Sequence, residues 1–288
     1  MLSDSALLGL PAPAKLNLFL HVLGRRPDGK HLLESVFTLI DLHDTIDLFR
    51  LETPSIERTG DVIGDPEKDL CVRAARLLME TFNVEGGIRI HVKKRIPAGA
   101  GLGGGSSDAA TTLIGLNRLF GLNLSREILM DIGEMLGADV PFFIFGQTGF
   151  VEGIGEIITP LYFPEASYAV IWPGRGISTA EIFAAQNLTR NTKSLKIDIL
   201  SGKALDIWPN LYGHNDLQSV AQALEHRVTE SLELLACGTY AARMTGSGSA
   251  VFGVIADPGS YRLPQLPDGW KGFAVKSLRE HPLSAWLD

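Results

Sequence analysis

The sequence predicts a mixed α/β protein built in two parts. Segments with strand-like alternation and segments with helical spacing follow one another along the chain. A length of 288 residues is enough for one large domain or for two of ordinary size. Glycines and prolines cluster between residues 153 and 164, as is typical of a boundary. We therefore predict one domain over residues 1–160 and a second over residues 161–288.

The first half carries most of the predicted elements. Residues 15–22 alternate apolar and polar side chains, so Lys15 and Asn17 share one face of a strand. After Ser125, which is a suitable helix cap, a helix should run to about Leu136. The remaining predictions for this half are strands at 35–40, 87–96 and 140–144, and helices at 70–82 and 109–120.

The second half repeats the alternation with shorter elements. We predict strands at 168–172 and 250–255, and helices at 217–224 and 228–237. A second glycine loop, residues 245–249, runs directly into the last of these strands.

Composition and charge limit the classes of function. With 45% hydrophobic and 20% charged residues the chain is globular, and a net charge of −7 repels the phosphate backbone of nucleic acids. No apolar run is long enough to span a membrane. Residues 6–10 are apolar but lack a preceding Lys or Arg, so we expect no signal peptide and a cytoplasmic location. The expected partner is a small molecule, bound by a monomer or a weak homodimer.

The two cysteines do not form a motif. Cys71 and Cys237 lie far apart, which disfavours a disulfide framework and a zinc site. Each is expected to be a small core residue.

Five glycines between residues 99 and 105 separate a predicted strand from a predicted helix. Glycine allows backbone N–H groups to turn toward a ligand, and a helix N-terminus adds unpaired N–H groups, so this segment predicts a phosphate-binding loop. The alternative is a tight linker in which Ser106 or Ser107 caps the helix. Gly99, Gly101 and Gly104 fit a dinucleotide-binding pattern by spacing, but the strand that should follow is missing, and there is no Walker A lysine.

Three polar residues outside the loop are candidates for chemistry. Lys15 and Asn17 share a strand face, and Asp139 lies between the helix-ending Gly137 and an apolar run. A lysine beside this carboxylate would keep it ionised, and such a pair can accept a hydroxyl proton during phosphoryl transfer. The alternatives are a solvated strand face and an ordinary loop carboxylate, because the sequence alone does not bring Lys15 to Asp139.

Residues 13–20, 97–110 and 245–252, in this order, resemble the three motifs of the GHMP small-molecule kinases. Within that superfamily, residues 23–31, 137–143 and 215–217 resemble the 4-diphosphocytidyl-2-C-methyl-D-erythritol kinases. The similarity covers about residues 13 to 255. It implies a two-lobed α/β fold with the active site between the lobes and a left-handed βαβ unit in the first lobe.

The resemblance also implies an activity. It is the ATP-dependent phosphorylation of the 2-hydroxyl of the cytidylylated methylerythritol, in the non-mevalonate route to isoprenoid precursors. ATP would be the co-substrate with Mg²⁺; the metal ligands stay open, with Ser106 or Ser107 conceivable. Asp139 would be the catalytic base, and Lys15 would stabilise its ionised form and orient the hydroxyl.

Roles for the remaining residues follow from the same resemblance. His31 would read the edge of the cytosine ring, and Phe183 would stack on its face. The residues expected to bind ATP are Lys94, Pro97, Ala98, Gly99, Ala100, Gly101, Leu102, Gly103, Gly104, Gly105, Ser106 and Ser107. The residues expected to bind the substrate are Asn17, Lys30, His31, Phe183, Thr245, Gly246 and Ser247.

The sequence departs from the family pattern at two positions. Lys30 stands where the family has a tyrosine that stacks on the cytosine, and a lysine offers a cation–π contact instead. Asp69 stands where the family has an asparagine near the adenine. Three alternatives remain: another GHMP kinase, such as a homoserine or mevalonate kinase; a non-catalytic nucleotide-binding protein; and a dinucleotide-dependent oxidoreductase.

Overall fold

The structure, a computed structural model, describes residues 5–287. The strands are β1 (Ala6–Arg25), β2 (His31–Leu51), β3 (Ile56–Gly60), β4 (Gly87–Lys93), β5 (Gly149–Gly153), β6 (Ile157–Pro160), β7 (Ser167–Trp172), β8 (Thr239–Met244), β9 (Val251–Ile255) and β10 (Lys271–Leu278). The α-helices are α1 (Leu70–Thr81), α2 (Gly104–Phe120), α3 (Arg126–Leu136), α4 (Val140–Phe145), α5 (Thr179–Ala184), α6 (Lys196–Leu200), α7 (Gln218–Leu224) and α8 (Arg227–Leu235).

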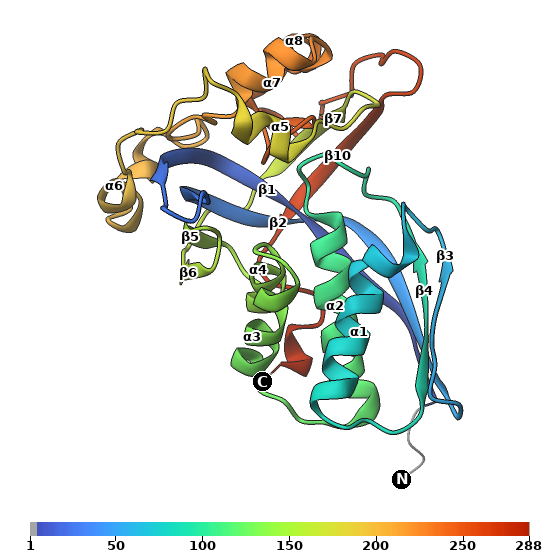
Figure 1. Ribbon diagram of the computed structural model, residues 1–288. Helices are drawn as coiled ribbons and strands as arrows, with labels where there is room; N and C mark the ends of the chain where they lie inside the picture. Colours follow the sequence, from blue (N-terminus) through green and yellow to red (C-terminus); the bar gives the residue numbers. More distant parts are fainter. Residues whose placement is uncertain (1–4, 288) are drawn as a thin grey trace.

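The long hairpin of β1 and β2 is the centre of the molecule. The two strands pair antiparallel over nearly their whole length, and β2 also pairs with β4, β5 and β10. Strand β10 pairs in turn with β7, which continues to β9 and β8. The last strand of the chain therefore connects the strands of the first half to those of the second, as the red arrow in Figure 1 shows.

Strand directions distinguish this architecture from a dinucleotide-binding fold. Among the described strands, β3 and β4 form the parallel pair, and the other strand pairs are antiparallel. A doubly wound dinucleotide fold needs a mostly parallel sheet with helices on both faces. The mixed α/β class is confirmed, and the dinucleotide alternative is wrong. Strand β3, helix α1 and strand β4 form a βαβ unit, in which the two strands are parallel.

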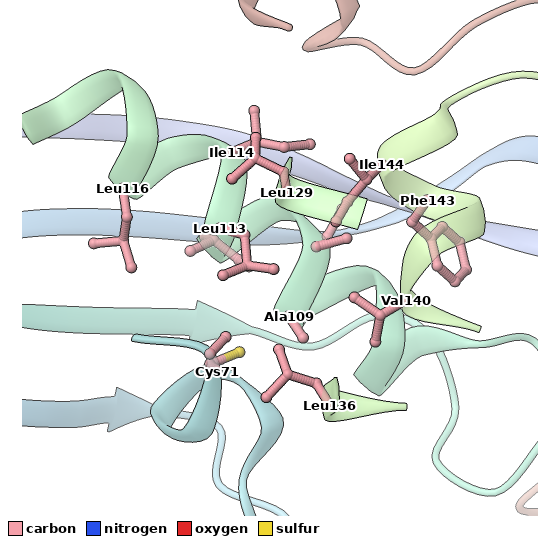
Figure 2. Packing of buried hydrophobic residues seen from close by; sticks show 14 of the residues in the cluster. Cys71, Ala109, Leu113, Ile114, Leu116, Leu129, Leu136, Val140, Phe143 and Ile144 are labelled. Carbon is pink, nitrogen blue, oxygen red and sulfur yellow. The ribbon is translucent and has the colours of Figure 1, made fainter. Parts of the chain in front are cut away.

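Helices α1 to α4 cover one face of the sheet formed by β1, β2, β4 and β3 (Figure 1). Figure 2 shows the core beneath them, in which Leu113 and Ile114 of α2 lie close to Leu129 of α3 and Ile144 of α4. Almost every residue of α2 beyond Ser106 is buried, because the helix is surrounded by α1, α3, α4 and the sheet. This packing fixes the N-terminus of α2, which begins in the glycine loop.

The structure corrects the prediction for residues 140–144. These residues form helix α4 and not a strand, with Pro141 in the first turn and Gly146 in the left-handed conformation that ends it. A short run in which every residue is apolar and buried shows neither the strand period nor the helix period. Its sequence therefore cannot distinguish a strand from a turn of helix. The proline at the start of a helix was the signal that favoured the helix.

The other predicted elements are present, with different ends. Helix α3 begins after Ser125, whose side chain accepts a hydrogen bond from the backbone N–H of Ile128, and it ends at Leu136. The two N-terminal strands are much longer than predicted, and α2 begins five residues earlier, at Gly104 rather than Ala109. Cys71 is buried as predicted, but Cys237 is exposed, because α8 ends before it and leaves it in a turn.

No helix among residues 5–287 is both long enough and apolar enough to cross a bilayer.

A buried histidine lies where the end of the chain returns to α4. The backbone N–H of His281 donates to Gly146 O at 2.6 Å, and the ring Nδ1 accepts from the backbone N–H of Leu283 at 3.0 Å. Its Nε2 has no hydrogen-bond partner among the described residues, and the side chain is fully buried. Burial, with the nearby charge of Arg126, lowers the pKa of His281 to about 4.

We predict that His281 makes the stability of the protein depend on pH. The unfolded chain takes up this proton near pH 6.5, whereas the folded protein does so near pH 4, so stability falls as pH decreases through that window. The contribution is on the order of 3 kcal/mol. His281→Asn keeps an acceptor for Leu283, and urea unfolding at pH 7 and 4.5 should show a smaller loss of unfolding free energy than in the wild type. The exposed His226, changed to Asn, is the control and should keep the wild-type difference.

Candidate active site

The three predicted motifs meet at one cavity of about 520 Å³. Both halves of the chain contribute to its walls, since Gly246 and Ser247 line it together with Lys15 and Asp139. The glycine loop contributes Pro97, Ala98, Gly99, Ala100, Gly101, Leu102, Gly103, Gly104, Gly105 and Ser106. Segments that are more than 100 residues apart in the sequence thus form a single site.

Lys15 and Asn17 lie on strand β1 but not on a solvated face. They are only 3% and 1% exposed, because helices cover one face of the hairpin and the third motif covers the other near this point. The interpretation as an ordinary solvated face is therefore wrong. Burial of a lysine requires compensating partners, since an isolated ammonium is costly to desolvate.

The Lys15 ammonium has three such partners. Its Nζ lies 3.7 Å from Asp139 Oδ2, donates a hydrogen bond to Asn17 Oδ1, and sits 4.4 Å from the centre of the Phe37 ring. Burial lowers the pKa of Lys15, and the charge of Asp139 opposes that shift. The pairing of Lys15 with Asp139, which the sequence left open, is present in the structure.

Asp139 occupies the turn between α3 and α4. Its side chain is 35% exposed, whereas that of Lys15 is 4% exposed, so the carboxylate faces the cavity while the ammonium lies behind it. The buried Phe142 and Phe143 of α4 anchor the turn against the core. A carboxylate held in this way can contact both Lys15 and a ligand in the cavity.

The glycine loop follows a path that other residues cannot take. Gly99, Gly101 and Gly103 have φ angles of +64°, +77° and +74°, in the left-handed region. A Cβ on Gly103 would lie 2.7 Å from the ring of Phe143, and one on Gly101 would lie 2.3 Å from Thr245 O. The loop is therefore pressed between α4 and the third motif, and its backbone forms the cavity wall.

Helix α2 begins inside this loop without a side-chain cap. Asp69 caps α1 and Ser125 caps α3, but the N-cap of α2 is Gly103, which accepts no such hydrogen bond. The first N–H groups of a helix have no partner within it and carry a partial positive charge, so this end of α2 suits an anion. The alternative in which Ser106 or Ser107 caps the helix is wrong.

The two serines of the loop have different positions. Ser106 lines the cavity, whereas Ser107 is completely buried and donates its hydroxyl to Pro13 O at 2.6 Å. Ser107 thus ties α2 to β1 and does not reach the cavity. Among the residues predicted to bind ATP, Ser107 is the one that does not line the cavity.

The third motif supports both other motifs. Thr245 Oγ1 accepts the backbone N–H of Asn17 at 2.9 Å, and Ala250 N–H donates to Ala100 O at 3.1 Å. Thr245 is fully buried and lies behind the wall that Gly246 and Ser247 form. Asn215, from the segment before α7, donates to Gly246 O at 2.9 Å. A change in any one of these loops should therefore displace the others.

Lys94 lies at the cavity wall but is held by two carboxylates that sequence reasoning did not identify. Its Nζ contacts Asp44 and lies 2.5 Å from Asp108 Oδ2. Burial raises the pKa of Asp108 to about 7, Lys94 opposes this, and Asp44 adds to it. Asp108 Oδ1 is buried without a hydrogen-bond partner among the described residues. The position of Asp108 directly after the two serines was a usable signal; nothing in the sequence indicated Asp44.

Asp69, the second departure from the family pattern, is fully engaged. One oxygen caps α1 by accepting the N–H of Cys71 at 2.8 Å, and the other pairs with Arg58 Nε at 2.9 Å. An asparagine could cap the helix but could not form this ion pair. Both Arg58 and Asp69 line the cavity.

Lys30 and His31 line a neighbouring cavity of about 600 Å³. Leu33 and Phe183 belong to the walls of both cavities, so the two are adjacent. The rings of His31 and Phe183 are stacked, with centroids 4.7 Å apart and planes inclined by 26°. The structure thus brings His31 and Phe183 together, with Lys30 exposed beside them, at a place distinct from the pair of Lys15 and Asp139.

Comparisons with known proteins agree with this geometry. The family model described as the GHMP kinases N terminal domain matches residues 69–147, and the GHMP kinases C terminal model matches residues 200–260. The 4-diphosphocytidyl-2-C-methyl-D-erythritol kinase of Cupriavidus metallidurans is 48% identical over 279 residues, covering 96% of this chain and 94% of that one. The kinase of the same name from Methylibium petroleiphilum is 47% identical and covers 99% of both chains.

Solved structures give the same result. A crystal structure of 4-(cytidine 5'-diphospho)-2C-methyl-D-erythritol kinase superposes with a TM-score of 0.75 at 31% identity, covering 94% of this chain and 98% of the other. The homoserine kinase of Cytophaga hutchinsonii superposes with a TM-score of 0.70 at 16% identity, covering 98% and 97%, which shows a shared fold alone. Identity near one half over almost the entire length of both chains places the protein in the 4-diphosphocytidyl-2-C-methyl-D-erythritol kinase family of the GHMP kinases.

Proposed function

We propose that the protein transfers the γ-phosphoryl group of ATP to the 2-hydroxyl of 4-diphosphocytidyl-2-C-methyl-D-erythritol. The observation that carries the proposal is the pair of Lys15 and Asp139, 3.7 Å apart in the same cavity as the glycine loop. The names of the relatives supply the substrate, and the neighbouring cavity with His31 and Phe183 offers a place for its base.

The loop from Pro97 to Ser106 is the proposed site of the triphosphate. Backbone N–H groups there and at the start of α2 would neutralise charge on the phosphate oxygens. Lys94 would influence the phosphates through its charge and not by a direct contact, because its ammonium is already shared between Asp44 and Asp108. Gly246 and Ser247 line the same cavity from the opposite loop, and we propose that they contact the bound substrates.

Mg²⁺ is the proposed metal, and the residues present fit it. Magnesium in kinases is held by one or two protein oxygens together with phosphate oxygens and water, so a cluster of three acidic side chains is not required. Ser106 offers a hydroxyl at the cavity wall, and Asp108 offers a buried oxygen without a hydrogen-bond partner among residues 5–287. The metal would supply charge neutralisation at the phosphates.

Asp139 is the proposed base. Its carboxylate would take the proton of the 2-hydroxyl as that oxygen forms a bond to the γ-phosphorus, while the bond from the γ-phosphorus to the β,γ-bridging oxygen breaks and ADP leaves. The Lys15 ammonium would keep the carboxylate ionised and orient the hydroxyl. The burial of Lys15 strengthens the attraction between its ammonium and the carboxylate, because charges interact more strongly away from water.

Location, assembly and domain division complete the proposal. We propose a cytoplasmic protein that acts as a monomer or weak homodimer and binds no nucleic acid, which the net charge of −7 supports. We also propose a division into functional lobes near residue 160, although β10 pairs with strands on both sides of that point.

The decisive assay measures ADP release with ATP and a panel of acceptors: the cytidylylated methylerythritol, homoserine and mevalonate. We expect turnover with the first alone. Turnover with another acceptor would identify a different GHMP kinase activity. ATP binding without ADP release from any acceptor would indicate a non-catalytic nucleotide-binding protein.

We predict that Asp139→Ala lowers kcat by a factor on the order of 10²–10⁴, the usual contribution of a general base. Steady-state kinetics with saturating ATP and cytidylylated substrate would measure it. Asp131, an exposed carboxylate on the neighbouring helix α3, provides the matched control, and Asp131→Ala should retain wild-type kcat. A near-normal kcat in Asp139→Ala would remove Asp139 from this role.

We predict a similar loss of kcat for Lys15→Ala, and an early alkaline limb in the wild-type pH profile. Burial lowers the pKa of Lys15 below 10.5, so activity that needs the ammonium should decline at a lower pH than for a free lysine. Lys203→Ala removes an exposed lysine and should leave both kcat and the profile unchanged. An unchanged kcat/KM in Lys15→Ala would contradict the assignment.

We predict that Gly103→Ala destabilises the protein and weakens ATP binding. An alanine there would adopt a left-handed φ of +74° and place its Cβ 2.7 Å from Phe143. The free energy of unfolding should fall by about 1–3 kcal/mol. Gly105 lies two residues on, and its added Cβ would have Leu70 Cδ1 as nearest atom at 3.8 Å. Gly105→Ala should therefore keep or slightly raise stability in urea unfolding, and equal losses in both variants would refute the steric argument.

A further inference from the structure

Arg190 holds together the two aromatic residues of the cavity beside the Lys15–Asp139 site. Its Nε donates to His31 Nε2 at 3.1 Å. One terminal nitrogen donates to the backbone oxygens of Phe183 and Ala185 at 2.8 and 2.7 Å, and the other donates to Leu188 O at 3.1 Å. All three nitrogens of the guanidinium are thus engaged, which fixes its position at the C-terminal end of helix α5.

The contact with Arg190 determines which nitrogen of His31 carries the proton. A guanidinium donates hydrogen bonds and accepts none, so His31 Nε2 must be the acceptor. In the neutral ring the proton then lies on Nδ1. Burial, together with the charges of Arg190 and Arg25, lowers the pKa of His31, which favours the neutral ring near pH 7. Stacking on Phe183 restricts the plane of the ring as well.

We infer that Arg190 is a positioning residue that fixes His31 as the Nδ1–H tautomer, so that the cavity presents a hydrogen-bond donor and selects cytosine over uracil. The inference rests on the proposed function for the identity of the substrate. Other charged side chains also line this cavity: Arg25, Lys30, Glu134 and Glu156. Among the bonds described, the one from Arg190 determines the acceptor nitrogen of the ring.

The selectivity follows from the edges of the two bases. Ring atom N3 of cytosine accepts a hydrogen bond, whereas N3 of uracil carries a proton and donates one. An Nδ1–H donor therefore pairs with cytosine, and against uracil it leaves two donors facing each other, which costs binding energy. Without Arg190, the ring could hold its proton on Nε2 and offer Nδ1 as an acceptor, which would suit uracil.

The tautomer can be measured directly on the wild-type protein without substrate. Nitrogen chemical shifts and couplings of ¹⁵N-histidine-labelled protein near pH 7.5 should show a neutral His31 with its proton on Nδ1, assigned by comparison with His31→Asn. In Arg190→Met the signal should shift toward the Nε2–H form. A wild-type ring protonated on Nε2 overturns the inference, whatever the enzyme phosphorylates.

Selectivity is tested with the cytidylylated polyol and its uridine analogue. Arg190→Met should lower the cytidine-to-uridine ratio of kcat/KM at least tenfold, through a higher KM for the cytidine substrate and a lower KM for the analogue, with kcat within threefold of wild type. Arg89→Met is the control, since it removes an exposed cation that pairs with Glu57 and lines neither cavity, and it should keep the wild-type ratio. An unchanged ratio in Arg190→Met, or an equal fall in both variants, overturns the inference. A wild-type protein that phosphorylates neither compound defeats the proposed function, and the nitrogen shifts then decide the tautomer alone.

Discussion

The burial of the Lys15 ammonium is the constraint on which the site depends. A charge that is 3% exposed needs partners, and each partner of Lys15 comes from a different element: Asn17 from β1, Phe37 from β2 and Asp139 from the turn before α4. Removing any of these partners would leave the buried charge with less compensation. The group that we propose for catalysis thus also holds the hairpin and α4 in place relative to each other.

Close backbone packing is the second constraint, and it explains why glycines occupy the loop at Gly101 and Gly103. The glycine loop touches the third motif so closely that a side chain at Gly101 would collide with Thr245 O. Thr245 in turn bonds the backbone of Asn17, beside Lys15. The glycine loop, the third motif and the buried lysine therefore form one unit, although they lie more than 80 residues apart in the sequence. Such a unit can hold a polyphosphate with little rearrangement of its walls.

Local sequence patterns predicted most elements, and the resemblance to the GHMP kinases added most of the proposed site residues, but neither indicated the surroundings of these residues. Alternation identified the strand that carries Lys15, and the five glycines predicted the loop that we propose as the phosphate site. Alternation did not show that β1 is covered on both faces, because burial depends on elements that pack on it from elsewhere in the chain. The apolar run after Asp139 lacked a period, so its helix was missed. Asp44 and Arg190 have no local signal at all: their roles arise from hydrogen bonds to Lys94 and His31, 50 and 159 residues away.

The separation of the two cavities has a consequence for how binding energy is used. Contacts made by a base in the cavity of His31 and Phe183 are the same before and during phosphoryl transfer, so they affect KM more than kcat. In the proposed mechanism, contacts at Lys15 and Asp139 act on the proton and the charge that move in the transition state, so they would affect kcat. Leu33 and Phe183 line both cavities and couple the two. Helix α5, which carries Phe183, is capped by Ser178 at its other end, so the position of the ring does not depend on Arg190 alone. Loss of the hydrogen bond from Arg190 to Phe183 O should therefore act on the binding of the base and affect KM more than kcat.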